Sequence, residues 1–345
     1  MNSSQQKRAL VTGATGFVGN AVTRALLSQG KSVRILSRPQ SNRELLKDLS
    51  VEVAWGDLRD IKSLQEALKG VDELYHVAAQ YTFYNPKPQE IYASNVEGTR
   101  NILEAGDKAG VQKMVYTSTV GAIGIPLDGS PGTEESPLSL EDCSGHYKRS
   151  KFLAEEEALK LAQKGLPIVI VNPSAPVGPR DVKPTPTGKM ILDFLKGKMP
   201  AYIETGLNLI DVDDCAQGHL LAAEKGKVGE RYILGNQNLR LKEILELLAE
   251  ITGLPAPKFQ IPYPVAQMAA WFSEGWAKLS GSVPAIEKEA VQLAKKFMFF
   301  DAGKAVRELG LPQSSPRQAL KKAVKWYLDH GYIPPKQVKK IKLKD

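Results

Sequence analysis

A tyrosine and a lysine stand four positions apart in the run Tyr147-Lys148-Arg149-Ser150-Lys151. On a helix, side chains at positions i and i+4 share one face, so Tyr147 and Lys151 would lie side by side. A phenol with its ordinary pKa of about 10 is a poor proton donor at neutral pH, and a neighbouring ammonium lowers that pKa. The spacing therefore predicts an acid–base pair, provided that the fold places it in a site.

A glycine-rich turn follows the first apolar run of the chain. Its residues are Thr12-Gly13-Ala14-Thr15-Gly16-Phe17-Val18-Gly19. The first glycine permits a tight turn, the second lets the backbone approach a pyrophosphate, and the third packs a helix against the preceding strand. The N-terminus of that helix would then face the phosphates. We expect a dinucleotide to contact Gly13, Thr15, Gly16, Phe17, Val18 and Gly19.

An arginine stands where NAD-binding proteins usually carry a carboxylate. That carboxylate, at the end of the second strand, bonds the ribose 2′-hydroxyl of NAD. This chain has Ser37-Arg38 there, with Arg43 nearby. Arg38 can pair with a 2′-phosphate, and at about 1.5–3 kcal/mol per charged hydrogen bond the preference for NADP is roughly 10- to 150-fold. The sequence favours NADP over NAD, with a solvated surface arginine as the alternative.

Residues after the third and fourth expected strands complete this candidate cofactor site. Asp57 can accept a hydrogen bond from the adenine amino group, and Leu58 can cover the ring. Ala78 and Ala79 close the fourth strand, where small side chains leave room for a cofactor. Asp57 has a second interpretation, as the cap of the helix that follows, and the two stay open.

Strands and helices alternate over the first half of the chain. Apolar runs predict strands at 9–11, 32–36, 51–54, 73–77, 113–117 and 167–171, and amphipathic runs predict helices at 18–28, 61–68, 91–109 and 146–164. Such alternation is typical of a parallel sheet with helices on both faces. The expected fold is α/β, a doubly wound parallel Rossmann sheet, with Tyr147 on the helix after the fifth strand.

The alternation stops beyond Pro173. A proline-rich loop is followed by a helix at 189–195, short strands at 202–203, 209–212 and 231–234, and a helix at 214–223; the chain is mainly helical from residue 241. We expect a dinucleotide-binding domain at 1–173, to which 209–235 returns. A smaller substrate-binding lobe would comprise 174–208 and 236–333, and a basic tail 334–345. Ligands often bind in a cleft between two lobes.

Composition excludes several classes of protein. Of the 345 residues, 42% are hydrophobic and 24% charged, which excludes disordered and fibrous classes. The net charge of +8 includes five lysines among the last ten residues, so we expect no nucleic-acid partner. Cys143 and Cys215 form no disulfide framework or zinc spacing, and the histidines lack metal-ligand spacing. We expect no metal and a reducing, cytoplasmic location. No run of 18 apolar residues indicates a transmembrane helix.

These motifs together resemble the extended short-chain dehydrogenase/reductase superfamily over almost the whole chain. The resemblance implies that Tyr147 is the general acid/base and that Lys151 holds the nicotinamide ribose and tunes Tyr147. Alignment with the family places Thr119 against the reacting oxygen, where the family usually has Ser, with Ser118 as a substitute. The resemblance also implies contacts with the cofactor or its surroundings from Asn95, Thr117, Pro173 and Ser174.

Two departures separate this chain from parts of that superfamily. Dehydratases of nucleotide sugars carry Asp-Glu directly after this Thr, where the chain has Val120-Gly121. Nucleotide-sugar epimerases usually place an Arg shortly before the acidic pair at Asp213-Asp214, and Gly206 to Ile210 contain none. Both differences favour the branches that are similar to dihydroflavonol reductases and hydroxysteroid dehydrogenases.

Three longer runs resemble the hopanoid-associated sugar epimerase family. They are GHYKRSKFLAEE at 145–156, NPSAPVGPRDVKPTPTG at 172–188 and TGLNL at 205–209. The resemblance implies a role in bacterial triterpenoid lipid metabolism and a small or lipid-linked substrate. Epimerase in that name is an assignment by analogy, which the sequence does not directly support.

Candidate substrate and surface residues each have a plainer alternative. Tyr81, Phe83 and Tyr84 would line the cleft or pack as a surface loop, and Arg180 would touch a polar head group or remain a solvated charge. A helical stripe of Val265, Met268, Phe272, Trp276 and Leu279 is more often core than a membrane or greasy-substrate contact. The lysine tail would be a disordered end, or a peripheral contact with anionic lipid. A homodimer is a family expectation only.

The sequence leaves three hypotheses on function. The first is an NADP-dependent oxidoreductase that moves hydride between nicotinamide and a carbonyl or secondary alcohol of an apolar substrate. The second is an NAD(P)-dependent sugar epimerase that oxidises and re-reduces one carbon. The third is a non-catalytic NADP-binding redox sensor, against which the intact pair of Tyr147 and Lys151 speaks.

Overall fold

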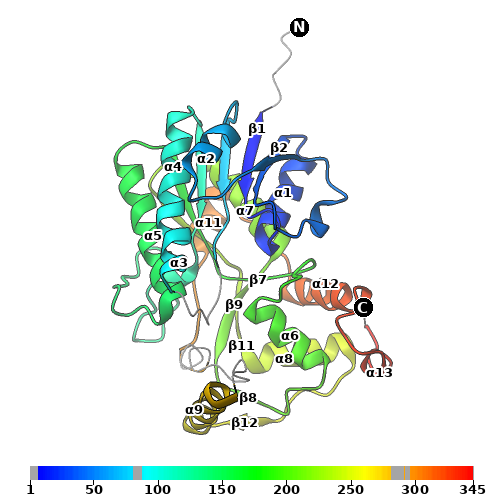
Figure 1. Cartoon of the computed structure of the whole chain (residues 1–345). Helices are drawn as coiled ribbons and strands as arrows, with labels where there is room; N and C mark the ends of the chain where they lie inside the picture. Colours follow the sequence, from blue (N-terminus) through cyan, green and yellow to red (C-terminus); the bar gives the residue numbers. More distant parts are fainter. Residues whose placement is uncertain (1–6, 81–87, 281–290, 292–295, 345) are drawn as a thin grey trace.

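A seven-stranded parallel sheet forms the centre of the large lobe (Figure 1). The computed structural model describes residues 7–80, 88–280, 291 and 296–344. The strands lie in the order β10-β6-β5-β4-β1-β2-β3, and all neighbours are parallel. Their bounds are β1 (Arg8–Thr12), β2 (Ser32–Ser37), β3 (Glu52–Trp55), β4 (Glu73–His76), β5 (Lys113–Thr117), β6 (Ile168–Pro173) and β10 (Arg231–Leu234). The predicted doubly wound α/β fold is confirmed.

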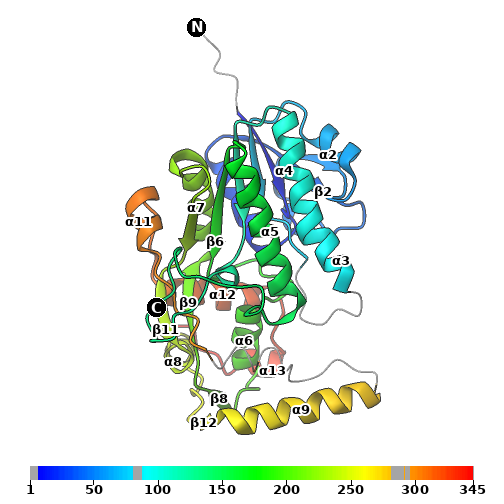
Figure 2. The same ribbon diagram turned by 90° about the vertical axis from the view of Figure 1, so that its left-hand side faces the viewer.

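Helices cover both faces of this sheet (Figures 1 and 2). Successive side chains of β1 show why both must be covered, since Ala9 and Val11 enter one buried core and Leu10 enters the other. The first core is completed by α1 (Phe17–Ser28), α7 (Val212–Lys225) and α11 (Gly303–Leu309), and the second by α2 (Ile61–Ala67), α4 (Gly98–Lys108) and α5 (Gly145–Gln163). The side chains near the carboxyl ends of the strands therefore come from different helices on the two faces of the sheet.

The helix expected at 91–109 is interrupted. It consists of α3 (Pro88–Tyr92), a π-helical segment (Ala93–Glu97) and α4. A π-helical turn holds more residues than a regular turn and often occurs at functional sites. Asn95 lies in this segment and is buried. A search for the regular 3.6-residue period cannot detect such a turn.

The small lobe has its own core beneath the large sheet (Figure 1). Its elements form a three-stranded sheet, β11-β9-β7, and a two-stranded sheet, β12-β8, with five helices of the described residues around them. Three of these strands were not predicted, because segments of three or four residues are too short to show alternation. The bounds are β7 (Ala175–Val177), β8 (Ala201–Ile203), β9 (Gly206–Asp211), β11 (Gln237–Arg240), β12 (Phe259–Ile261), α6 (Pro186–Leu195), α8 (Leu241–Thr252), α9 (Tyr263–Ser280), α12 (Pro316–Asp329) and α13 (Pro335–Val338).

The chain returns to the large lobe at α7. The sequence placed this return at residue 209, but β9 pairs with β7 and β11 in the small sheet. Helix α7 then packs along α1, and β10 adds to the free edge of β6. Helix α11, expected within the small lobe, also packs on α7 and β10.

The C-terminal tail is attached to the small lobe. The amide of Lys342 donates to the Thr252 carbonyl oxygen at 2.8 Å, and the amide of Lys344 donates to that of Ile251 at 2.9 Å. Both carbonyls belong to the last turn of α8, which has no further helical partners to offer them. The expectation of a disordered tail is therefore wrong for the residues up to 344.

Helix α9 exposes the apolar stripe that was expected in the core. The exposed fractions are 49% for Val265, 57% for Met268, 75% for Phe272 and 71% for Trp276. The expectation of a buried stripe is therefore wrong for these four residues. In the described part of the chain, no helix is both long and apolar enough to span a membrane.

The third glycine of the turn can be tested by its packing. A Cβ on Gly19 would overlap the carbonyl oxygen of Gly13, whereas a Cβ on Gly275 of α9 would meet nothing within 4 Å. We expect Gly19→Ala to lower the free energy of unfolding by about 1–3 kcal/mol through overpacking. The matched change Gly275→Ala should raise it by up to about 1 kcal/mol. Urea unfolding measures both, and equal effects of the two substitutions would contradict the close packing at Gly19.

Candidate active site

The glycine turn packs directly against the end of β4. Gly13 has a φ of 76°, and its carbonyl accepts from the Gly16 amide at 2.8 Å. A Cβ on Gly13 would lie 2.8 Å from the nitrogen of Ala78, whose N–H donates to Thr12 Oγ1 at 3.1 Å. Two predicted cofactor segments therefore meet between β1 and β4, where the strand order reverses and nucleotides bind in such sheets.

The N-terminus of α1 is open toward this turn. Its cap, Gly16, is exposed, and no side chain caps the helix. The first amides of a helix need acceptors, and a phosphate supplies them. Phe17 and Val18 pack partly against the core, and Thr15 is half-buried. The backbone of the turn is thus arranged as the sequence predicted for a pyrophosphate.

Guanidinium groups gather beyond the ends of β2 and β3. Arg38 is exposed, and Arg43 lies over the Trp55 ring at 4.5 Å. Arg59 donates from Nε to Asp57 Oδ1 at 2.9 Å, which holds the pKa of Asp57 below its usual value. The charge of Arg38 also acts on Asp57, in the same direction.

The capping interpretation of Asp57 is wrong. The cap of α2 is Asp60, whose side chain accepts from the Lys62 amide, because the helix begins one turn later than Asp57 would require. Asp57 instead binds Arg59, and its contact with adenine stays a prediction. Leu58 packs near Gly98 at the start of α4.

Lys151 is buried in the interior beside β5. Its Nζ donates to the Thr117 carbonyl oxygen at 2.7 Å and to the Tyr116 hydroxyl at 3.0 Å. Burial lowers the pKa of Lys151 to about 7, although the nearby Glu155 carboxylate acts in the opposite direction. The Thr117 side chain points elsewhere, to His219 Nε2 at 3.0 Å, so its carbonyl serves Lys151.

Tyr147 lies one turn before Lys151 on α5 and is half-buried. Burial raises its pKa well above the ordinary value of a tyrosine. The sequence argument expected the Lys151 ammonium to lower this pKa. Burial outweighs that effect at Tyr147, so the direction is opposite to the expected one. Tyr147 therefore keeps its proton at neutral pH and can act as an acid.

Thr119 and Ser118 differ in what their hydroxyls can reach. Thr119 Oγ1 accepts from the Gly121 amide at 3.1 Å, which leaves its own proton free for another acceptor, and the residue is half-buried. Ser118 is 6% exposed, so its hydroxyl is buried beneath the site, where it has no hydrogen-bond partner in the described structure. The geometry favours Thr119 over Ser118 as the hydroxyl that meets a substrate.

A buried polar network that the sequence analysis missed links α5 to β6. Asn172 Nδ2 donates to Glu155 Oε2 at 2.7 Å and to the Thr119 carbonyl at 3.1 Å. Arg231 Nη1 pairs with Glu155 Oε1 at 3.1 Å, which compensates a carboxyl whose pKa burial raises. One sequence signal existed: Glu155 follows Lys151 by four positions and so shares its buried face.

Asn95 joins the π-helical segment to α5. Its Nδ2 donates to Ser150 Oγ at 2.9 Å, and its Oδ1 accepts from the Gln80 amide at 2.7 Å. Behind Lys151, His76 stacks on Tyr116 with ring centroids 5.7 Å apart. Burial, and secondarily the charge of Lys151, lower the pKa of His76 to about 3, so this imidazole is neutral. Buried polar and aromatic side chains therefore surround Lys151 beneath the candidate site.

Comparison with known proteins identifies the family. Residues 9–235 match the family described as NAD dependent epimerase/dehydratase. The chain belongs to this family. A Synechocystis sp. protein, provisionally named dihydroflavonol 4-reductase, is 49% identical over 94% of this chain and 95% of its own length. The Sterol demethylase protein B of Methylococcus capsulatus is 37% identical over 94% and 99%. The crystal structure of gox2253 has a TM-score of 0.85 and 47% identity, covering 95% of this chain and all of that one.

As a member of this epimerase/dehydratase family, the protein is an NAD(P)-dependent oxidoreductase of the short-chain dehydrogenase/reductase type. The residues present fit such a cofactor. The glycine turn and the uncapped end of α1 suit the pyrophosphate. At the other end of the site, Asn172 Oδ1 and Ser174 Oγ are buried atoms without a hydrogen-bond partner in the described structure. Pro173 and Ser174 are therefore well placed to meet the nicotinamide end, and their contact with it stays a prediction.

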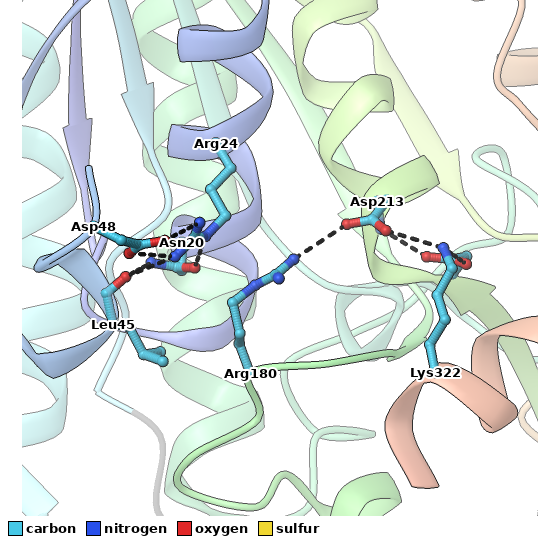
Figure 3. Close-up of polar contacts among 8 residues, drawn as sticks. Asn20, Arg24, Leu45, Asp48, Arg180, Asp213 and Lys322 are labelled. Atoms are coloured by element: carbon cyan, nitrogen blue, oxygen red, sulfur yellow. Dashed lines mark hydrogen bonds and ion pairs between the residues drawn. The ribbon is translucent and has the colours of Figure 1, made fainter. Parts of the chain in front are cut away.

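The structure places Arg180 on the side of α1 and α7, as Figure 3 shows. Its guanidinium pairs with Asp213 at 3.5 Å, beside the Arg24 and Asp48 ion pair. Among the described residues, Arg180 is the one non-glycine with positive φ, at 73°. Helix α5, which carries Tyr147, covers the opposite face of the sheet, and the role of Arg180 toward substrate stays a prediction. Tyr81 and Tyr84 lie outside the described residues.

The buried amine of Lys151 predicts a pH dependence of stability. Its pKa is about 7 in the folded protein and about 10.4 in an unfolded chain, so the unfolded state binds more protons between these values. The contribution of Lys151 to the free energy of unfolding therefore rises with pH from about 7 to about 10. Lys151→Met removes this titration. We expect the stability of the variant, relative to the native protein, to fall steadily from pH 6 to pH 9.5.

Urea unfolding of both proteins across this pH range provides the measurement. Other titrating groups contribute equally to the two proteins and cancel in the difference. A difference in stability that stays constant with pH would show that Lys151 keeps an ordinary pKa.

Proposed function

We propose that the protein is an NADP-dependent oxidoreductase that moves hydride between nicotinamide and a carbonyl or secondary alcohol of an apolar, lipid-derived substrate. The observation that carries this proposal is the placement of Tyr147, Lys151 and Thr119. Tyr147 and Lys151 lie one turn apart on α5, Lys151 donates to the Thr117 carbonyl oxygen at the end of β5, and Thr119 follows two residues later.

Each residue has a defined task in the reductive direction. A nicotinamide held beside Pro173 and Ser174 would supply the hydride for the carbonyl carbon. Tyr147 gives its hydroxyl proton to the carbonyl oxygen, which completes the alcohol. Thr119 donates a hydrogen bond to the same oxygen and keeps its proton; the Gly121 amide occupies one of the two lone pairs of Thr119 Oγ1. Lys151 holds the ribose, with its amine oriented by the Thr117 carbonyl.

Several observations support reduction or dehydrogenation of a lipid-derived substrate. Val120, which stands where nucleotide-sugar dehydratases have an acid, is 6% exposed and packs in the core. The Synechocystis relative bears the name of a reductase, and the Methylococcus relative bears that of a sterol demethylase protein. The resemblance to hopanoid-associated proteins points to a triterpenoid, another polycyclic lipid, so an alcohol or ketone on such a skeleton is the proposed substrate.

The proton donor is tested by Tyr147→Phe, which removes only a hydroxyl. We expect turnover to fall about 10²–10⁴-fold, while the Kd for NADPH changes little. The matched variant Tyr332→Phe removes a hydroxyl bonded to the Val182 carbonyl in the small lobe, and it should retain activity. Nicotinamide absorbance reports turnover with a panel of sterol-like and triterpenoid ketones and alcohols, aldehydes and sugar nucleotides.

Two outcomes of this experiment would contradict the proposal. Loss of NADPH binding in Tyr147→Phe would show that the residue is structural. A substrate whose stereochemistry changes without net oxidation or reduction of the cofactor would show that the protein is an epimerase.

The cofactor preference is tested by Arg38→Ser. Arg38 is exposed at the end of β2, and Arg59 occupies the nearby Asp57 carboxylate, so a 2′-phosphate meets little negative charge there. We expect the Kd for NADPH to rise roughly tenfold or more and that for NADH to stay within about twofold. Lys47→Ser, which removes an exposed cation further along the same connection, should change neither Kd. Equal weakening of NADPH and NADH would refute a role at the 2′-phosphate.

A further inference from the structure

Helix α9 buries small side chains and exposes large apolar ones. Ala266, Ala270 and Ala277 are buried against the small lobe, at 6%, 1% and 7% exposure. The outer side carries Val265, Met268, Trp271, Phe272 and Trp276, between 49% and 75% exposed. A surface helix normally buries its large apolar residues and exposes polar ones. The outer side of α9 is thus an apolar surface that the described protein leaves in water.

Other segments of the small lobe also expose apolar side chains. Phe259 on β12 is 75% exposed, and in the tail Val338 and Leu343 are 39% and 44% exposed. Figure 2 shows α9 as a rod along the end of the small lobe, far from the large sheet. We call α9, β12 and the tail the end face of the small lobe. Contiguous apolar patches that a protein exposes to water often mark interaction sites.

The end face is also basic. Three of its chain segments, 196–203, 253–265 and 331–344, contain no aspartate or glutamate, whereas α9 itself contains Glu274. They adjoin one another in the structure, because β8 pairs with β12, Gln337 lies beside Gly197, and the tail amides bond to the last turn of α8. These segments hold eight lysines, Lys196, Lys198, Lys258, Lys336, Lys339, Lys340, Lys342 and Lys344. Seven of these eight lysines are exposed. Lys258 precedes α9 by five residues, whereas the tail lies on the other side of the small lobe from α9 (Figure 1).

We propose that the end face docks on the surface of an anionic lipid bilayer, with α9 lying in the plane of the interface. Aromatic and aliphatic side chains on one side of a helix enter the boundary between headgroups and acyl chains, and nearby lysines are attracted to anionic headgroups. Because no described helix can span a bilayer, the contact is peripheral. A second copy of the chain is a poorer occupant, since a symmetric contact would bring both sets of lysines together with few carboxylates, Glu274 among them, to neutralise them.

Vesicle sedimentation of the full chain tests this proposal. We use vesicles of phosphatidylcholine with one quarter phosphatidylglycerol, and vesicles of phosphatidylcholine alone, at 0.1 M and 0.5 M salt. The protein should bind the anionic vesicles at least tenfold more tightly, and higher salt should reduce this difference. The double variant Phe272→Ser/Trp276→Ser should bind at least tenfold more weakly. Leu127→Ser, at a fully exposed leucine of the large lobe, should bind as the native protein does.

The controls separate docking from other causes. Each variant must retain NADPH binding, which shows that the large lobe is folded, and circular dichroism must show unchanged helix content. The proposal is overturned if the native protein stays in the supernatant with both vesicle types, or if the double variant binds as tightly as the native protein. It is also overturned if sedimentation velocity shows a native dimer that the double variant converts to monomer, since the face would then belong to a second copy.

Discussion

The arrangement of the active site depends on one buried charge. Lys151 has almost no contact with solvent, and an amine in that position requires compensating acceptors. The Thr117 carbonyl and the Tyr116 hydroxyl supply them, which ties α5 to the end of β5. Tyr147 stands one turn earlier on α5, and Thr119 two residues beyond Thr117. The contact that stabilises the amine therefore also sets the distance between the two groups that would meet a substrate oxygen.

A second contact holds the same elements from the other side. Asn172 on β6 bonds at once to Glu155 of α5 and to the carbonyl of Thr119. Because β5 and β6 pair in fixed register, two strands and one helix hold the short segment after β5 that carries Thr119. Arg231 on β10 completes the network by pairing with Glu155. Strand β10 is the last strand of the large sheet along the chain, and it follows the first segments of the small lobe. It thus compensates a charge buried beneath the site.

Sequence reasoning succeeded where one local rule decides the structure. The glycine spacing after β1 predicted the turn, and alternating apolar runs predicted every strand of the large sheet. It failed where the deciding partner is far away in the chain. Glu155 depends on Asn172 and Arg231, which no spacing connects, and burial reversed the expected direction of the pKa of Tyr147. Strands β7, β11 and β12 owe their existence to neighbours, because three or four residues carry too little pattern of their own.

Helix α9 shows why an apolar stripe does not by itself identify a core. Periodicity tells which residues share a side of a helix, and leaves open which side faces inward. In α9 the alanines face inward, since small side chains let the helix approach the lobe closely, and this leaves the tryptophans and phenylalanine outside. Exposure of this apolar side to water is unfavourable, so we expect it to contact another apolar phase or a protein partner. The lysines of the small lobe outnumber Glu274 of α9 and the few other carboxylates near this end, and they favour a negatively charged apolar phase.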